Sequence, residues 1–343
     1  MIKINLALQG GGAHGAFTWG VLDRILEDDD IEIAAISGTS AGALNAAGLK
    51  AGMVKDGREG AREALAWVWG KVGAVPQDGF TQWLNMWSPS NQVLADALEK
   101  SPAFAAIDMM QRMMSPYVFG PLMQNPLEGI LNQLDFASVC HRSGPEIHIC
   151  ATNVRSGKIR VFAGTEITPE AIMASACLPT VFQAVEKFDP KTGQTEAYWD
   201  GGYTGNPALY PLFAPHLPDD ILIVNINPLY RQELPTQTQS IQNRINEISF
   251  NSSLLRELRA IDFVKRLLVD GKLPQGTMKD VMVHMVADDA LMNTLNVATK
   301  TVAIPLMLQR LKEAGRTAAD QFLTAHKADL NKRSTVDLTA MFS

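Results

Sequence analysis

The sequence predicts an α/β fold: a three-layer sandwich with a mainly parallel central sheet flanked by helices, followed by a mostly helical C-terminal extension. The first observation is that short apolar runs alternate with stretches of helical periodicity from the N-terminus onward. The second is that glycines gather where the first two apolar runs end, as they do in sharp strand-to-helix turns. Of the 343 residues, 46% are hydrophobic and 19% are charged, which provides a large core and excludes global disorder.

The N-terminal elements follow in order from their hydropathy. Residues 2–8 form an apolar run of strand length, and the apolar residues of 14–28 recur at helical spacing. A second short strand is expected at 31–37, and an Ala-rich helix is expected at 41–52, directly after Ser40. Strands and helices that alternate at this pace indicate crossover connections between parallel strands.

The rest of the chain continues with a helical stretch at 58–136 and then returns to strand character. The elements expected there are strands at 146–154 and 158–164, a helix at 168–182 that stops at Pro179, a hairpin turn at 188–194, and strands at 196–202 and 220–228. The polar segment 229–240 is the expected boundary, and beyond it a helical stripe is interrupted by one short strand at 281–287. The predicted domains are therefore 1–229 and a mostly helical extension at 240–343, packed on or next to the first.

Charge and cysteine content narrow the function classes. The net charge of -6 argues against nucleic-acid binding, although a local basic patch would suffice for transient contact with a membrane surface. We see neither a secretory signal nor an apolar run of about 18 residues, and we expect a cytoplasmic protein. The spacing of Cys140, Cys150 and Cys177 does not suit a metal, so we expect buried free thiols, no metal and no cofactor.

Ser40 stands at the centre of the segment GTSAG, residues 38–42, where a predicted strand changes into a helix. Gly38 and Gly42 remove the Cβ atoms that would clash in a sharp turn, so the pattern suits a nucleophile exposed on such a turn. The alternative is an ordinary serine N-cap before a helix.

A glycine-rich segment, QGGGAHG at residues 9–15, follows the first strand directly. It satisfies the spacing of a dinucleotide-binding turn, but no acidic residue ends the second strand to bind a ribose, and the Lys of a P-loop is missing. Backbone N–H groups at the start of a helix can instead converge on an anion and act as an oxyanion hole. A merely tight turn is the alternative. Since parallel strands end at the same edge of a sheet, this turn should lie next to Ser40.

A base for the serine is best sought in the segment YWDGG, residues 198–202. Asp200 ends an apolar strand and is followed by Gly201 and Gly202, so its carboxylate can reach a neighbouring site. The alternative is a common Asp-Gly turn. None of the six histidines has a sequence context that singles it out as a triad member.

Taken together, these motifs resemble the patatin-like phospholipase family. The glycine block, the G-x-S-x-G serine and the Asp-Gly-Gly follow in the family's order, and ASACLPTVF at 174–182 matches its Ala-Ser-x-x-x-Pro block. The resemblance covers roughly residues 3–228. One departure is His14, where the family often has Arg or Lys. Because histidine is mostly neutral at pH 7, this position does not provide a fixed positive charge.

The resemblance implies a lipid acyl hydrolase, a phospholipase A or esterase, that works through an acyl-enzyme with Ser40 as nucleophile and Asp200 as base. The residues that it implies for the oxyanion hole are Gly10, Gly11, Gly12 and Ala13. The residues that it implies as supports are His14, Gly15, Gly38, Gly42, Gly201 and Gly202. Residues from about 80 to 125 would then form an acyl groove or a mobile lid, or plain core.

Three alternatives remain open. An acyltransferase, or a hydrolase of another ester such as a storage polyester or thioester, would use the same dyad. A lipid-binding module without catalysis would not require an intact Ser40 and Asp200. The expected partner is a lipid or other acyl ester, and a homo-oligomer is compatible with the sequence.

Overall fold

The structure is a computed structural model, and it describes residues 1–74, 90–102, 104, 114–119, 125–236, 238–274 and 276–342. The segment from about 80 to 125, predicted as a groove or lid, lies in large part outside these described residues. The parts of it that are described include α4 (Asn91–Glu99) and α6 (Pro116–Phe119).

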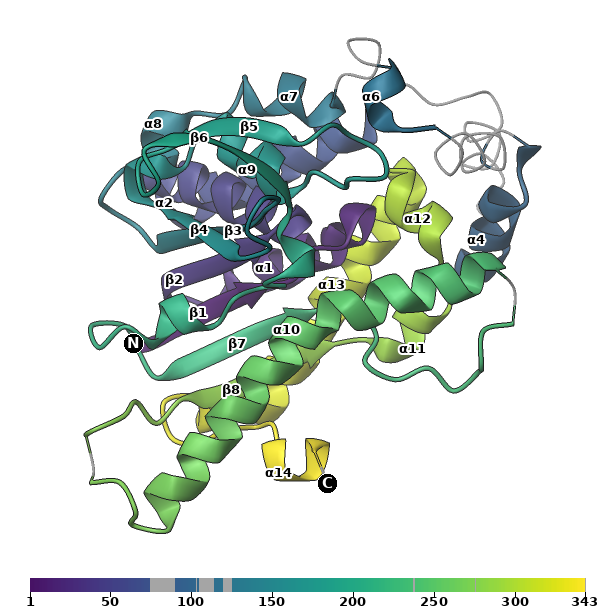
Figure 1. Ribbon diagram of the computed structural model, residues 1–343. Helices are drawn as coiled ribbons and strands as arrows, with labels where there is room; N and C mark the ends of the chain where they lie inside the picture. Colours follow the sequence, from purple (N-terminus) through teal and green to yellow (C-terminus); the bar gives the residue numbers. More distant parts are fainter. Residues whose placement is uncertain are drawn as a thin grey trace.

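One eight-stranded sheet forms the middle layer (Figure 1). Its strands are β1 (Ile2–Leu8), β2 (Ile31–Thr39), β3 (Glu146–Asn153), β4 (Ile159–Ala163), β5 (Val185–Asp189), β6 (Gln194–Asp200), β7 (Asp220–Asn225) and β8 (Met282–Ala287). They are ordered β5-β6-β3-β2-β1-β7-β8, and β4 pairs with β3 outside this order. The pairs β3–β2, β2–β1, β1–β7 and β7–β8 are parallel, whereas β4 and β6 run antiparallel to β3. The predicted fold class, a mainly parallel sheet flanked by helices with a helical C-terminal region, is confirmed.

Helices cover the sheet on both faces. The longer ones are α1 (Gly15–Ile25), α2 (Ala41–Gly73), α10 (Thr238–Val269) and α13 (Pro305–His326). The shorter ones are α7 (Pro126–Leu131), α8 (Phe136–Val139), α9 (Pro169–Ser175), α11 (Asp289–Asn293), α12 (Val297–Thr301) and α14 (Leu338–Met341). Short 3-10 turns are η1 (Gly12–His14), η3 (Gly164–Glu166), η4 (Gly201–Tyr203), η5 (Tyr210–Phe213) and η6 (Lys327–Asp329).

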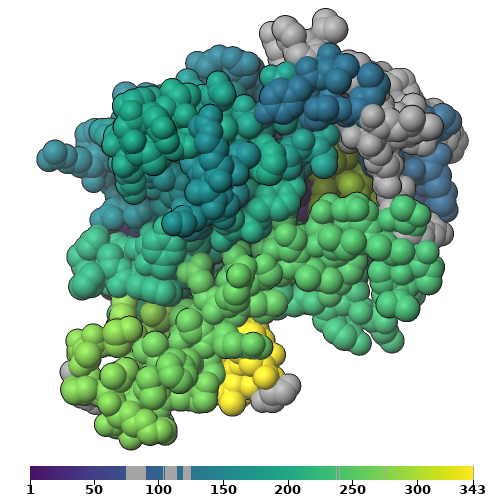
Figure 2. Space-filling view, in the orientation of Figure 1, coloured from purple at the N-terminus to yellow at the C-terminus, as the bar shows by residue number. Residues whose placement is uncertain are grey.

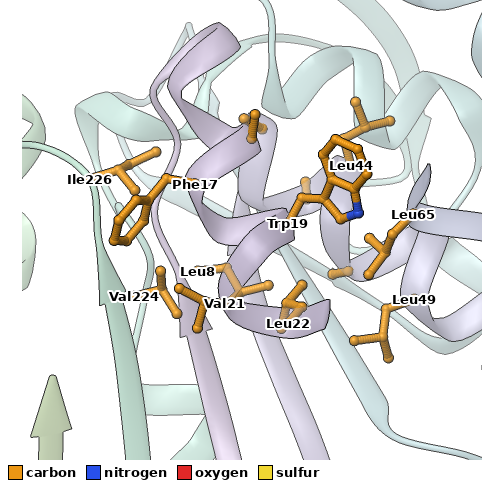
Figure 3. Close-up of a cluster of buried hydrophobic side chains, with 14 of the residues drawn as sticks. Leu8, Phe17, Trp19, Val21, Leu22, Leu44, Leu49, Leu65, Val224 and Ile226 are labelled. Carbon is orange, nitrogen blue, oxygen red and sulfur yellow. The ribbon is translucent and has the colours of Figure 1, made fainter. Parts of the chain in front are cut away.

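The alternation of side chains along β1 separates two apolar cores. Leu6 and Leu8 point into the larger core with α1, α2 and α13, while Ala7 belongs to a smaller core with α10. Figure 3 shows Leu8 and Val224, which pair on neighbouring strands, close to Val21 of α1. Burying a side chain of this size contributes roughly 1.5–3 kcal/mol, so the two cores hold the sheet as a rigid base for the turns at its edge.

The segment after residue 240 is built into the same body. Its strand β8 pairs in parallel with β7, and α13 packs against α1. The close approach of α13 to α1 requires Gly20 and Gly315, because a Cβ at either position would collide with a carbonyl of the other helix. The division of the chain into 1–229 and 240–343 stays a prediction.

Two predicted helices have different ends in the structure. The helix that begins after Ser40 runs to Gly73, with a break at Asp56 and Gly57, where Gly57 has a φ of 58°. The helix after Thr168 ends at Ser175 and does not reach Pro179. A residue that precedes proline is disfavoured in helical conformation, so the chain leaves the helix early. In the part of the chain that the structure describes, every helix is too short or too polar to span a bilayer.

Candidate active site

Ser40 lies alone on the sharp turn between β2 and α2, with φ 53° and ψ -117°. A non-glycine residue in such a conformation costs of order 1–3 kcal/mol, which the surrounding fold must supply. A Cβ at Gly38 would lie 2.6 Å from the carbonyl oxygen of Gly42, and a Cβ at Gly42 would collide with the carbonyl of Leu8. The Ser40 side chain makes no cap hydrogen bond to α2. Ser40 therefore occupies the N-cap position of α2, but its side chain does not cap the helix as that alternative expects.

Asp200 ends β6 and lies opposite Ala151 of β3, which brings it to the edge where β2 ends. Its Oδ1 accepts a hydrogen bond from the N–H of Gly202 at 2.7 Å, and its own N–H donates to the carbonyl of Cys177 at 2.8 Å. The Ser40 hydroxyl lies beside the carboxyl group and, as a hydrogen-bond donor, lowers its pKa. Burial outweighs both donors and raises the pKa of Asp200 to about 7.

Ser175, at the end of α9, supports the turn of Ser40. The N–H of Ser40 donates to Ser175 Oγ at 2.8 Å, and Ser175 Oγ donates to the carbonyl of Cys150 at 2.6 Å. In the sequence, Ser175 falls within the ASACLPTVF block, and no local pattern assigns it a role. Its contact with Ser40 spans 135 positions, which explains why no local pattern indicated it.

The glycine turn after β1 lies against the Ser40 turn, as the parallel pairing of β1 and β2 predicts. A Cβ at Gly10 would lie 2.7 Å from Ser40 Cβ. Gly12 has φ 59°, a left-handed conformation that favours glycine, and a Cβ there would collide with the carbonyl of Lys300.

The backbone amides of this turn divide into two groups. The N–H of Gly10 donates to Asn206 Oδ1 at 2.6 Å, so this amide is engaged and is not a free oxyanion donor. The amides of Gly11, Gly12 and Ala13 donate to none of the described residues. Of the four predicted oxyanion donors, Gly10 is therefore wrong, whereas Gly11, Gly12 and Ala13 stay a prediction.

Gly15, Gly201 and Gly202 are sites of close packing. A Cβ at Gly15 would lie 2.5 Å from Ala41 Cβ, and one at Gly202 would lie 2.7 Å from the ring of Phe250. A Cβ at Gly201 would collide with the carbonyl of Cys150. Gly15 lets α1 approach the Ser40 turn, and Gly201 and Gly202 let β3 and α10 approach the turn after Asp200.

A buried network of side-chain amides holds the glycine turn from below. Gln9 Oε1 accepts from the N–H of Asn227 at 3.0 Å, and Gln9 Nε2 donates to Asn251 Oδ1 at 3.1 Å. Asn227 Nδ2 donates to the carbonyl of Gly10 at 2.8 Å. Asn251 belongs to α10 and in turn donates to the carbonyl of Asn227 at 3.2 Å. Sequence reasoning missed this network, since its members are separated by up to 242 positions.

We expect Asn251→Ala to lower kcat of ester hydrolysis roughly tenfold with a smaller change in KM. The substitution removes one of the two acceptors of the buried Gln9 amide and leaves the longer contact with the carbonyl of Asn206 at 3.4 Å, which costs about 1–3 kcal/mol and loosens the turn. Steady-state kinetics with a p-nitrophenyl ester measure the effect. The control is Asn246→Ala, an exposed asparagine of the same helix. Equal effects of the two variants would contradict this role of the network.

His14 is buried under the glycine turn and is neutral. Its Nε2 is 2.9 Å from Thr299 Oγ1, and its Nδ1 has no hydrogen-bond partner among the described residues. Burial, and next the positive charges of Lys300 and Arg231, hold its pKa well below the usual range. No fixed charge therefore stands at this position of the turn.

The described residues contain no group of three or more His, Cys, Asp or Glu side chains that suits a metal ion. The three cysteines are free, as predicted, although Cys140 is only half-buried. Burial raises the pKa of the Cys177 thiol to about 12, and the charge of Asp200 acts in the same direction. These thiols are poor nucleophiles at neutral pH.

Two solved structures have a similar chain fold. VipD from Legionella pneumophila matches with a TM-score of 0.43 and 16% identity, over 94% of this chain and 67% of VipD. The type III effector ExoU matches with a TM-score of 0.36 and 15% identity, over 95% of this chain and 53% of ExoU. Likeness of this degree carries no inference about activity. A search of curated proteins produced no significant match.

The family comparison is more specific. The family model described as patatin-like phospholipase matches residues 6–213, which is more than half of the chain. The matched stretch contains the glycine turn, Ser40 and Asp200, and ends before α10, α12 and α13. The chain belongs to the patatin-like phospholipase family.

Proposed function

We propose that the protein is a serine lipid acyl hydrolase in which Ser40 is the nucleophile and Asp200 is the general base. The observation that carries the proposal is the placement of a strained serine beside a buried carboxyl group and three free backbone amides. Family membership supports hydrolysis of lipid acyl esters. Among the described residues, no histidine forms a hydrogen bond with Ser40. His14, which lies in the glycine turn, binds Thr299 instead.

The reaction would follow two half-reactions. Ser40 Oγ attacks the ester carbonyl carbon and its proton passes to Asp200, while the carbonyl oxygen becomes an oxyanion bound by the amides of Gly11, Gly12 and Ala13. The tetrahedral intermediate collapses, and the leaving alcohol takes the proton from Asp200. Water then attacks the acyl-enzyme and Asp200 accepts its proton. The second tetrahedral intermediate collapses, the fatty acid leaves, and Asp200 returns the proton to Ser40 Oγ.

The environment of Asp200 suits this role. An ordinary carboxylate is a weak base, but a pKa of about 7 brings its basicity close to that of an imidazole. The oxyanion forms near the N-terminus of α2, whose dipole favours negative charge. The site thereby compensates for the missing histidine.

Two measurements together test the proposal. Phospholipids, acylglycerols and short p-nitrophenyl esters are incubated with the protein, and product analysis identifies the cleaved bond. A fluorophosphonate probe is then expected to label Ser40 with one adduct per chain. A protein that hydrolyses none of these esters and resists the probe would be a binding module instead.

We expect no histidine to be essential. His14→Gln should lower activity only in part, because it disturbs the contact with Thr299 under the glycine turn. Replacing His284 should appear mainly as lost stability, since its Nε2 is 2.9 Å from the buried Asp220. The histidines expected to stay within several-fold of wild type, each replaced by Gln, are His141, His148, His216, His284 and His326. A folded variant among these five with activity as low as that of Ser40→Ala would contradict the Ser-Asp dyad and indicate a catalytic triad that contains this histidine.

A further inference from the structure

Three cationic side chains surround one buried carboxylate next to the glycine turn. Glu247 of α10 has a fully buried side chain and accepts from Arg231 at 2.7 and 2.8 Å. Arg244 lies 3.3 Å and Lys300 3.5 Å from the same carboxylate. Among the described residues, no other carboxylate forms an ion pair with these three cations, so positive charge is in local excess in a chain of net charge -6.

Lys300 is the member of this cluster that reaches the glycine turn. Its Nζ donates to Asn227 Oδ1 at 3.3 Å, and the same oxygen would lie 3.7 Å from a Cβ built at Gly11. Its element, α12, also binds His14 through Thr299. Figure 2 shows a hollow in which atoms coloured for the N-terminus and for the C-terminal part of the chain are visible at depth.

The two arginines are already engaged. The guanidinium of Arg231 donates to Glu247 and to the carbonyl of Asn293, and that of Arg244 donates to Glu247 and to the carbonyls of Pro228 and Leu229. The ammonium of Lys300 has three hydrogens, and among the described residues it has contacts only with Glu247 and Asn227.

The charge of Lys300 is poorly compensated. Burial, opposed by Glu247 and assisted by Arg231, lowers the pKa of Lys300. A desolvated cation with a spare donor is stabilised by an incoming anion more than a surface lysine would be.

We propose that Lys300 binds a phosphate group that the substrate carries near the ester cleaved by Ser40. The inference rests on the proposed function and specifies its substrate: an acyl ester of a phosphorylated alcohol. The cluster of Arg231, Arg244 and Lys300 supplies the positive field, Lys300 supplies the direct contact, and Glu247 holds the three cations in place. The competing explanation is that the cluster only ties α10 and α12 together.

The kinetic test compares two esters that differ only in the phosphate. They are 1-hexanoylglycerol 3-phosphate and 1-hexanoylglycerol, and the readout is the ratio of their kcat/KM values. We expect Lys300→Met to lower this ratio roughly 10- to 100-fold, the equivalent of one lost hydrogen bond to a charged group, and Lys300→Arg to retain most of it. The control is Lys279→Met, because Lys279 is similarly buried but donates to the carbonyls of Leu212, Ala214 and Leu217 and lies near Asp219. Its ratio should equal that of wild type.

A binding test makes the inference independent of turnover. Calorimetric titration of Ser40→Ala with glycerol 3-phosphate, inorganic phosphate and glycerol should detect binding of the first, and the double variant with Lys300→Met should lose it. Binding of inorganic phosphate with equal affinity would support the site and show that the phosphate alone is recognised. An unchanged kinetic ratio in Lys300→Met, or no binding of either phosphate compound, overturns the inference. If wild type cleaves neither ester, the titration alone decides on the anion site, while the proposed function is decided separately by the ester panel and the fluorophosphonate probe.

Discussion

Replacing Ser40 by alanine is expected to lower ester hydrolysis roughly 10⁴- to 10⁶-fold while the protein stays folded. The substitution removes the Oγ that would form the acyl-enzyme, and no other nucleophile is expected to take its place. Alanine meets the same φ of 53°, so the strain of the turn is unchanged. The Asp200 carboxyl group loses the Ser40 donor that lowers its pKa, so this pKa should rise further.

The control for this experiment is Ser37→Ala. Ser37 is a buried serine of β2, the strand that precedes Ser40, and its Oγ donates to the carbonyl of Ala208 at 2.6 Å. Rates with a p-nitrophenyl ester, together with circular dichroism, separate chemistry from folding. A folded Ser40→Ala protein that keeps more than a few per cent of wild-type activity would rule Ser40 out as the nucleophile.

Asp200→Asn is expected to lower kcat roughly 10²- to 10⁴-fold, the range for loss of a general base. The asparagine keeps an oxygen for the N–H of Gly202 but cannot accept the proton of Ser40. In wild type, activity should rise with pH through about 7 and then level off, because only the ionised carboxylate can act as base. The residual activity of the variant should lack this rise. Combining the variant with Ser40→Ala should add little, because the two residues act as one unit.

The same substitution is expected to stabilise the protein at high pH. Because the folded-state pKa of Asp200 is raised from 3.8 to about 7, the folded state binds this proton more tightly than the unfolded state does. Its contribution to stability is present below pH 4 and is lost as the pH rises through 7. About three pKa units at 1.36 kcal/mol each amount to about 4 kcal/mol. The free energy of unfolding of Asp200→Asn should therefore exceed that of wild type at pH 8 and match it more closely at pH 4.

A matched control is Glu257→Gln. Burial also raises the pKa of Glu257 to about 7, and its carboxylate accepts from the amides of Leu209 and Tyr210 instead of from Ser40. Urea titrations at pH 4 and pH 8 should show a gain at high pH for both variants, whereas only Asp200→Asn should lose activity. An Asp200→Asn protein that keeps wild-type kcat, or that is destabilised equally at both pH values, would contradict the assignment of a buried base.

Local patterns were sufficient for the parts of the site that depend on the backbone. The apolar run before Ser40 and the glycines on either side of it require a sharp turn, because other residues would clash there. The same reasoning applies to the glycine turn after β1 and to Asp200 at the end of β6. The parallel order of β1 and β2 then brings the two turns together, since parallel strands end at the same edge.

The ends of helices were less predictable than their presence, because helical periodicity in a sequence does not show at which residue the packing against other elements ends. The helix after Ser40 extends beyond the Ala-rich run, which ends at residue 52, as far as the break at Asp56 and Gly57. A second helical segment then runs to Gly73, within the helical stretch expected from residue 58. The segment after residue 240 reads as a separate helical extension by composition. Pairing of β8 with β7 places it in the central sheet, and this pairing depends on contacts far apart in the chain.

The fold class, the family resemblance and the candidate residues Ser40 and Asp200 could be predicted from short runs of sequence, because the chemistry of each run is local. The contacts of the glycine-turn amides could not be predicted in this way, since Asn206 binds the N–H of Gly10 across 196 positions. Only the tertiary structure revealed the support from Asn251 and the charge of Lys300 beside a neutral His14. Hydrogen bonds and ion pairs between distant segments leave no periodic trace in a sequence, because any amide or ammonium of suitable length can satisfy them once the sheet has brought the segments together.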